Sequence, residues 1–289
     1  MTKIGANRHR LPGAAAAALL TCAALWTSAG IAATITDACG LTPLPSGQVR
    51  DVVDGRTLRL RDGREVRLAA IDVPPIETPR GREAQLFLAA LLTGQTVSLK
   101  AARSGVQDRY GRLVVYVFTA DEGLERSLQA VMLEGGLARV AARVGSYGCA
   151  SAFWAREQNA RTARRGLWAD RETIVPAQST ATLLERRGRP VLVEGTVISV
   201  RESGGTIYVN FGRRWSEDFT VTIAKRNARI FAAAGVAPKQ LARQRVRVRG
   251  VVEERGGPWI EALRPEQIEV LEHRAEKWDP DVRQAQQPL

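Results

Sequence analysis

Short runs of apolar and β-branched residues predict strands in the first half of the chain. The runs 57–60 and 65–68 lie on either side of Asp62-Gly63, and an Asp-Gly pair supplies the positive φ that a tight hairpin needs. Further runs, rich in β-branched and aromatic residues, lie at 97–100 and 113–118. The pattern therefore predicts a β-rich unit that begins with a hairpin.

Apolar residues also recur at helical spacing in three stretches of this half. These stretches are 82–92, 124–135 and 152–165, and Gly166 follows the last of them, where a helix commonly ends. The predicted order is strands, helix, strands, helix, helix. We place this first domain at 46–171.

A second strand-rich pattern follows a weakly periodic stretch that contains Pro, Ser and Thr. Strands are predicted at 191–200 and 206–211, on either side of Gly204-Gly205, a hairpin signal. The predicted divisions are a linker at 172–187, a small β domain at 188–272 and a loose polar tail at 273–289.

One predicted strand of the second domain alternates arginine with valine. Val246 and Val248 are expected to face a core, so that Arg245, Arg247 and Arg249 line the opposite face. A basic sheet face of this kind favours a polyanionic ligand, although solvated surface arginines would give the same pattern.

The composition is that of a globular protein. The chain has 289 residues, of which 45% are hydrophobic and 25% charged, which excludes a disulfide mini-protein and a wholly disordered chain. A formal net charge of +12 suits an anionic partner such as nucleic acid, but it also suits a merely solvated surface. Two His residues argue against a His-ligated metal site or a His-dependent catalytic triad.

The first residues have the layout of a secretory signal peptide. Residues 1–33 contain no acidic residue, and Lys3, Arg8 and Arg10 precede an apolar stretch at 14–26. An anchor helix that stays attached is the alternative. We expect export to the periplasm or the medium, and no other stretch is apolar enough to span a membrane.

Removal of such a leader leaves two cysteines, Cys39 and Cys149. An even number of cysteines in an oxidising compartment predicts a disulfide, and two unpaired thiols are the alternative.

Several ordered motifs carry a family resemblance between about residues 50 and 168. They are Val53–Thr57, Val66–Pro74, Asp108–Arg112, Gly135–Val140 and Gly166–Trp168. In this stretch the chain resembles the thermonuclease, or staphylococcal nuclease-like, family. The resemblance implies a mainly β fold with helices (α+β): an OB-type five-stranded barrel with three helices. Residues 188–272 resemble the OB-like extensions of some bacterial members, which implies a second small OB-like β-barrel.

The resemblance also implies site residues for cleavage of DNA and RNA phosphodiesters with a calcium ion. Planar guanidinium groups suit the negative charge that develops on the phosphoryl oxygens, and carboxylates suit a hard divalent cation. The implied roles are catalysis for Arg67 and Arg112, metal binding for Asp72 and Asp54, and contact with nucleotide phosphate for Arg109 and Tyr110.

Two positions depart from the family pattern. Arg56 stands where the family has a metal-binding Asp, and Pro75 stands where it has the Glu assigned as general base. We therefore expect Ca²⁺ to bind weakly or not at all, because a guanidinium would repel the ion. Glu77 is an alternative catalytic base, on a loop that Pro74-Pro75 stiffens.

We hypothesise that Arg56 occupies the vacated cation position and pairs with Asp72 and Asp54. The site is then a metal-free phosphate cradle of Arg56, Arg67 and Arg112. The non-functional alternatives are that Arg56 faces solvent, that the other two arginines form surface salt bridges, and that Asp72 is a turn or cap residue.

These features favour an exported, monomeric protein that binds DNA or RNA, single strands in particular, with hydrolysis weak or lost. The alternatives are an active metal-dependent endonuclease and an interaction module of the cell envelope. In the second domain Arg213, Arg245 and Arg247 are the candidate nucleic-acid contacts. The candidate stacking residues Tyr208, Phe211 and Trp215 are equally consistent with core packing.

Overall fold

The computed structural model describes residues 39–102, 107–119, 127–214 and 216–271. The predicted leader at 1–33, the tail at 273–289 and Trp215 lie outside these ranges. Within the part that is described, no helix is long and apolar enough to cross a membrane.

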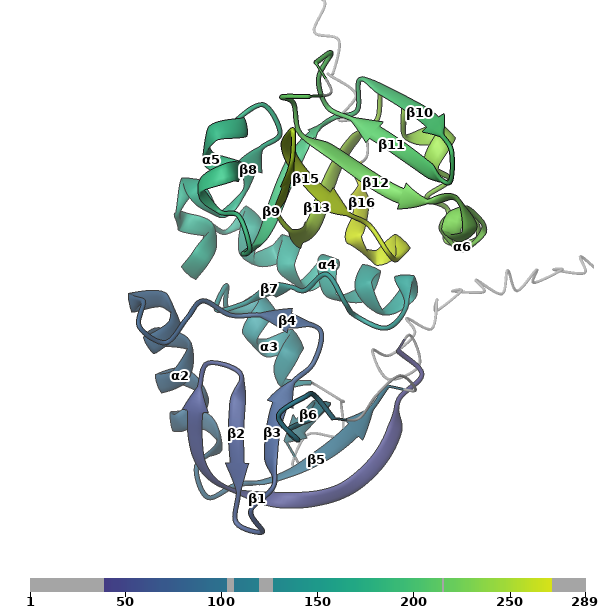
Figure 1. Cartoon of the computed structure of the whole chain (residues 1–289). Coiled ribbons are helices and arrows are strands. Elements are labelled where there is room, and N and C mark those ends of the chain that lie inside the picture. The colour runs from purple at the N-terminus through teal and green to yellow at the C-terminus, as the bar shows by residue number, and fades with distance from the viewer. Residues whose placement is uncertain (1–38, 103–106, 120–126, 215, 272–289) are drawn as a thin grey trace, which may run out of the picture. The chain divides into compact units, whose positions relative to one another are not determined.

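The first half forms the five-stranded closed barrel that the sequence predicts (Figure 1). Its strands, in spatial order, are β1 (Thr42–Asp54), β2 (Thr57–Leu60), β3 (Glu65–Leu68), β6 (Leu113–Thr119) and β5 (Thr96–Ala101). The long strand β1 pairs antiparallel with both β2 and β5 and so closes the barrel. Register shifts in β1 at Leu44/Gly47 and Val49/Asp51 bend it between its two partners.

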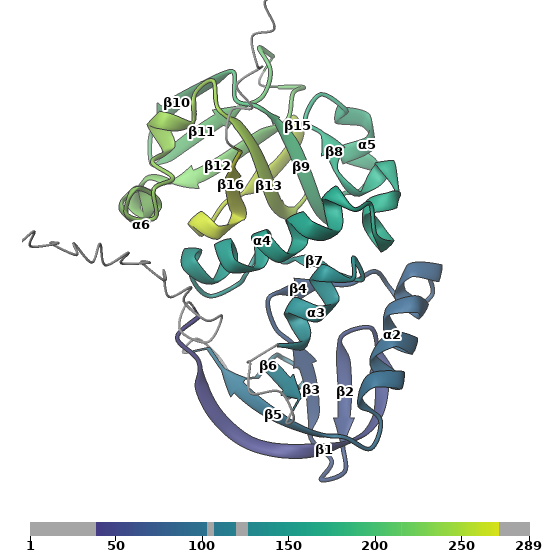
Figure 2. The same ribbon diagram turned by 180° about the vertical axis from the view of Figure 1, so that it is seen from behind.

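Three α-helices accompany the barrel, as predicted. They are α2 (Pro79–Leu92), α3 (Leu128–Glu134) and α4 (Tyr147–Thr162). Each begins at a hydroxyl N-cap that accepts a hydrogen bond from a backbone amide of the first turn: Thr78, Ser127 and Ser146. In both views α4 lies beside α3 (Figure 1; Figure 2). The disulfide between Cys39 and Cys149 ties the segment before β1 to the first turn of α4.

A two-stranded sheet lies beside the barrel and positions one acidic residue. Strand β4 (Ile71–Asp72) pairs antiparallel with β7 (Arg139–Val140), which places Asp72 opposite Arg139. Val140 and Ile71 are buried in the barrel core, so their neighbours Asp72 and Arg139 are held at its edge.

The second half consists of two sheets around one core. One sheet has the order β10 (Ser199–Ser203), β11 (Thr206–Asn210), β12 (Thr220–Ala224), β15 (Gly257–Glu261) and β14 (Glu253–Arg255). The other has the order β16 (Ile268–Val270), β13 (Arg245–Val251), β9 (Pro190–Thr196) and β8 (Val175–Pro176). The remaining helices are α5 (Thr180–Glu185), α6 (Ala228–Ala233) and 3-10 turns at Gly166–Ala169, Arg171–Thr173, Lys225–Asn227, Pro238–Leu241 and Pro265–Gln267.

The stretch 172–187, expected as a linker, instead contributes to the second core. Val175 pairs with β9, and Leu183 of α5 is fully buried among the apolar residues of this half. The stretch is too short for its periodicity to show, and its burial depends on strands that follow it in the chain.

The arginines of β13 do not form the exposed basic face that the alternation suggested. Arg247 and Arg249 are 8% and 2% exposed, and both donate hydrogen bonds to Glu269 of the neighbouring strand β16. Arg245 and Arg247 also bond Glu194 of β9. A buried guanidinium is costly unless a carboxylate neutralises it, and these strands provide the carboxylates. The assignment of Arg247 to nucleic-acid binding is therefore corrected, because it belongs to a buried ion-pair network. Arg245 is paired with Glu194, but its side chain is 63% exposed, so the prediction for Arg245 stays open.

Candidate functional site

The centre of the candidate site is an ion pair between Arg56 and Asp72. Arg56 lies in the tight turn between β1 and β2, and its Nη1 donates to Asp72 Oδ1 at 3.0 Å and to the carbonyl of Ile71 at 3.1 Å. Both side chains are about a quarter exposed, at 27% and 22%. The structure thus places the guanidinium of Arg56 directly on the carboxylate that the family resemblance assigns to metal binding.

The carboxylate of Asp54 accepts hydrogen bonds from the β1–β2 turn and none from the guanidinium of Arg56. Its Oδ1 accepts from the backbone N–H of Arg56 at 2.8 Å, and its Oδ2 accepts from Thr57 Oγ1 at 3.0 Å. Asp54 therefore orients Arg56 through the backbone. The hypothesis that the Arg56 side chain pairs with both acids holds for Asp72 and needs this correction for Asp54.

Arg67 stands next to this pair without a carboxylate of its own. Its Nη1 lies 3.4 Å from Thr57 Oγ1, and it makes no ion pair with any residue that the structure describes. Burial lowers the pKa of the Arg67 guanidinium, and the positive charges of Arg56 and Arg112 lower it further. Arg67 is therefore close enough to Arg56 and Arg112 to be repelled by both, and the carboxylates of Asp54 and Asp108 attract it more weakly.

Arg112 is held by an acidic residue of its own loop. Its Nε and Nη2 lie 2.8 and 2.7 Å from Asp108 Oδ2, while Asp108 Oδ1 accepts from the backbone N–H groups of Tyr110 and Arg112. Tyr110 is 66% exposed, and the guanidinium groups of Arg109 and Arg112 lie 4.8 and 4.9 Å from the centre of its ring. The loop offers one exposed aromatic ring and two cations at the edge of the barrel.

The donor set at the centre of this site does not fit a calcium ion. Asp72 Oδ1 is bonded to Arg56, and both oxygens of Asp54 accept hydrogen bonds within the turn. Among the described residues, no three His, Cys, Asp or Glu side chains come together as metal ligands. A hard divalent cation needs several free oxygens, and the guanidinium of Arg56 adds repulsion.

Pro75 lines the same hollow as Arg56 and Asp72, whereas Glu77 does not. The hollow measures about 860 Å³. The carbonyl of Pro75 accepts from the N–H and the hydroxyl of Thr78, at 2.9 and 2.6 Å, which fixes the loop at the start of α2. Glu77 is exposed and lies outside the lining. Arg67 and Arg112 do not line this hollow either.

Arg139 and Arg189 also line this hollow, and the sequence reasoning did not single them out. Arg139 faces Asp72 across the β4–β7 pair, and its Nη2 donates to the carbonyl of Pro190 at 2.5 Å. Burial lowers the pKa of the Arg139 guanidinium. The motif 135–140 contains Arg139, so a signal was present; nothing in the sequence indicates that Arg189 lies nearby.

The remaining candidates lie in the second half. Tyr208 is 37% exposed, whereas Phe211 is 4% exposed and packs against Phe219 in the core. Arg213 is exposed and lies beside a hollow that Tyr208 also lines. Of the predicted contacts in this half, Tyr208, Arg213 and Arg245 are exposed.

Comparison with known proteins agrees with this geometry. A family model described as "Staphylococcal nuclease homologue" matches residues 65–170. An "Uncharacterized endonuclease" of Escherichia coli O157:H7 is 30% identical over 133 residues, which cover 45% of this chain and 81% of that protein. A protein of the same name from Escherichia coli matches with the same identity and the same coverage.

Proposed function

We propose, since this chain belongs to the staphylococcal nuclease homologue family, that it binds phosphodiester groups of nucleic acid at the barrel and hydrolyses them weakly or not at all. The binding site is the cradle of Arg56, Arg67 and Arg112. The protein therefore binds the same class of ligand as a nuclease, and its hydrolytic activity is weak or lost.

The observation that carries this proposal is the guanidinium of Arg67, which has no ion-pair partner among the described residues. A half-buried cation flanked by Arg56 and Arg112 is unfavourable unless an anion joins it. A phosphate group supplies two oxygens to a guanidinium fork and neutralises the surplus charge. Tyr110, exposed beside Arg112, offers an unpaired base a surface for stacking.

The same geometry argues against efficient hydrolysis. Attack by water requires a base and stabilisation of the developing charge. The guanidinium groups can stabilise the charge, but position 75 carries a proline, and Glu77 does not line the hollow that Arg56 and Asp72 share. Because the donor set does not fit Ca²⁺, we derive no step through a metal.

Binding is tested with a fluorescein-labelled single-stranded oligonucleotide and fluorescence anisotropy. Arg67→Ala is expected to weaken binding by about 10- to 100-fold, the value of a charge-assisted hydrogen bond. It should also reduce the slope of log Kd against log salt concentration by about 0.7. Arg61→Ala is the matched control, because Arg61 is exposed in the β2–β3 hairpin of the same barrel. An equal loss in both variants would mean that only net charge matters and would contradict the cradle.

An active metal-dependent endonuclease is the second candidate, because Arg67 and Arg112 are retained and the relatives carry that name. Incubation of single-stranded DNA with the purified protein in Ca²⁺ and in EDTA separates the two. We expect no cleavage in either buffer. Cleavage in Ca²⁺ that EDTA abolishes would establish the second candidate.

We also propose that the protein is exported to the periplasm or the medium. The disulfide between Cys39 and Cys149 supports this, because such bonds persist in oxidising compartments. Fusion of residues 1–33 to an export-dependent reporter tests it, and a reporter that stays inactive would contradict it.

A further inference from the structure

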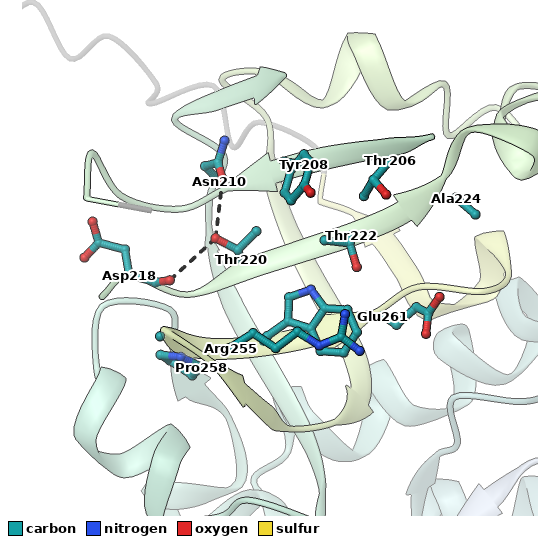
Figure 3. Close-up of a pocket in the computed structure, with 12 residues that line it drawn as sticks. Thr206, Tyr208, Asn210, Asp218, Thr220, Thr222, Ala224, Arg255, Pro258 and Glu261 are labelled. Atoms are coloured by element: carbon teal, nitrogen blue, oxygen red, sulfur yellow. Dashed lines mark hydrogen bonds between the residues drawn. The ribbon is translucent and has the colours of Figure 1, made fainter. Parts of the chain in front are cut away.

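The five-stranded sheet of the second half packs its apolar residues against the core on one side. Alternate residues of its strands, among them Ile207, Val209 and Val221, are buried in the core. The residues between them, among them Tyr208 and Thr222, lie on the opposite side (Figure 3). That side is hollowed, with one depression of about 310 Å³ and a second of about 650 Å³.

Polar side chains line the hollow in cross-strand rows. Tyr208 pairs with Thr222, and Asn210 pairs with Thr220, which in turn pairs with Trp259. Thr220 Oγ1 donates a hydrogen bond to Asn210 Oδ1 at 3.4 Å. A dashed line in Figure 3 marks this bond. The hydroxyl groups of Tyr208 and Thr222 form no hydrogen bond within the described ranges. The hollow therefore contains two hydroxyl groups without an internal partner, one on Tyr208, which is 37% exposed, and one on Thr222, which is 6% exposed.

Two aromatic rings stand on this side of the sheet. Tyr208 lies on the wall of both depressions and is 37% exposed. Trp259 is covered by Arg255, whose guanidinium carbon lies 3.6 Å from the ring centre. The hollow thus has one open aromatic surface and one aromatic–guanidinium stack (Figure 3).

The charges of the larger depression favour an anionic ligand. Arg201 and Arg213 line the larger depression, are exposed, and form no ion pair with residues that the structure describes. The nearby carboxylate of Glu202 is already paired with two lysines, and Asp218 accepts from the backbone N–H of Arg214 at 2.7 Å. Of the acidic residues that line the two depressions, Glu261 is left without a partner among the described residues.

We propose that this hollowed face, defined by Tyr208, Trp259, Arg255, Arg201 and Arg213, is a second binding site and that it holds a short stretch of unpaired nucleic acid. A base stacks on Tyr208, and the Arg255–Trp259 stack receives a neighbouring base. Threonine hydroxyls, Asn210 and Glu261 bond the base edges, which only unpaired nucleotides expose fully. Arg201 and Arg213 contact the phosphates.

The proposal goes beyond the barrel cradle, because it uses a different sheet and requires single strands. The test therefore uses the full chain with Arg67→Ala and Arg112→Ala as the background, so that the cradle does not contribute. The probe is a fluorescein-labelled oligothymidylate of about twelve nucleotides, within the usual length bound by one single-strand-binding domain. Anisotropy gives Kd.

In this background Tyr208→Ala is expected to weaken binding of the probe by about 5- to 150-fold, the range for loss of one stacked base. Tyr208→Phe keeps the ring and should bind like the background protein. Ile230→Ala is the matched control, since Ile230 is a 49% exposed apolar residue of the same half, on α6, away from the hollow. Thermal melting checks that each variant is folded.

Salt dependence gives an independent measurement. Replacement of Arg201 and Arg213 by Gln removes two phosphate contacts and should reduce the log–log salt slope by about 1.4. An unchanged Kd in Tyr208→Ala would overturn the proposal whether or not the cradle binds. Binding of a neutral oligosaccharide mixture that Tyr208→Ala abolishes, with no binding of oligothymidylate, would also overturn it and assign the face to sugars.

Discussion

Arg249 of β13 donates from Nη2 to Oε1 of Glu157 in α4 at 3.0 Å, although 92 residues separate them in the chain. The side chains are 3% and 0% exposed. Glu157 Oε2 also accepts from the backbone N–H of Val140 at 2.9 Å. Because Val140 lies in β7, which pairs with the strand of Asp72, one buried carboxylate connects the second half of the chain to the edge of the candidate site.

We expect Arg249→Ala to lower the free energy of unfolding by about 3–5 kcal/mol, because it leaves Glu157 and Glu269 buried and without this partner. Urea denaturation followed by circular dichroism measures the change. Arg214→Ala is the control, since its pair with Glu217 is 73% and 57% exposed and should be worth less than about 1 kcal/mol. Similar losses in both variants would contradict a special role for the buried network.

The same network predicts acid sensitivity. Burial alone would raise the pKa of the Glu269 carboxyl, but the neighbouring guanidinium groups, Arg249 first, outweigh burial and lower the pKa to about 2. A carboxyl with a lowered pKa stabilises the fold above its unfolded value near 4.5, and this stabilisation is lost as the pH falls toward 2.

Urea titrations of the unmodified protein and of Glu269→Gln from pH 6 to pH 2 test this. The difference in unfolding free energy between the two should shrink by up to about 3 kcal/mol as the pH falls below 4.5. A difference that stays constant over this interval would show that Glu269 does not carry the effect.

Arg67→Met should separate stability from binding. Removal of a half-buried cation that lacks a carboxylate relieves its repulsion with Arg56 and Arg112, so the unfolding free energy should stay equal or rise by about 1 kcal/mol. Nucleic-acid binding should fall at the same time. Denaturation and anisotropy measured on one preparation provide both numbers, and a clear loss of stability would indicate a structural role for Arg67.

Arg56→Asp combined with Pro75→Glu should create Ca²⁺-dependent hydrolysis of single-stranded DNA. The first change removes the guanidinium from Asp72 and adds a carboxylate, and the second places a base in the wall of the same hollow. Product release in Ca²⁺ and in EDTA is the measurement. Each single variant is a control and should remain inactive; a double variant that folds but binds no Ca²⁺ would show that further residues are needed.

The disulfide should contribute strongly to stability, because Cys39 and Cys149 are 110 residues apart. In the chain-entropy model a loop of this length stabilises the fold by about 4–5 kcal/mol. Cys39→Ser combined with Cys149→Ser, compared with the unmodified protein in urea without reductant, measures this. A loss below about 1 kcal/mol would imply that the unfolded chain is already compact.

Much of the first half was predictable because its signals are local. The Asp62-Gly63 turn and the helical spacing in α2 and α4 depend on residues near one another in sequence, and the barrel follows from the ordered motifs. Helix α2 begins at Pro79, three residues before the predicted 82, because the N-cap Thr78 sets its start. The segment 172–187 escaped prediction because its burial against β9 and β15 depends on strands that come later.

Short-range periodicity in the sequence predicted strands and three helices in the first half, and the family resemblance of its motifs implied the barrel and the two departures at Arg56 and Pro75. Only the tertiary structure decided which carboxylates pair with the arginines. The arginines of β13 look like a binding surface in the sequence, yet Glu194, Glu269 and Glu157 neutralise them from three other elements. Charge neutralisation depends on distances between remote segments, and no local pattern encodes these distances. For the same reason, Arg67 was identifiable as an arginine of the site, but its lack of a carboxylate partner among the described residues became visible only in the fold.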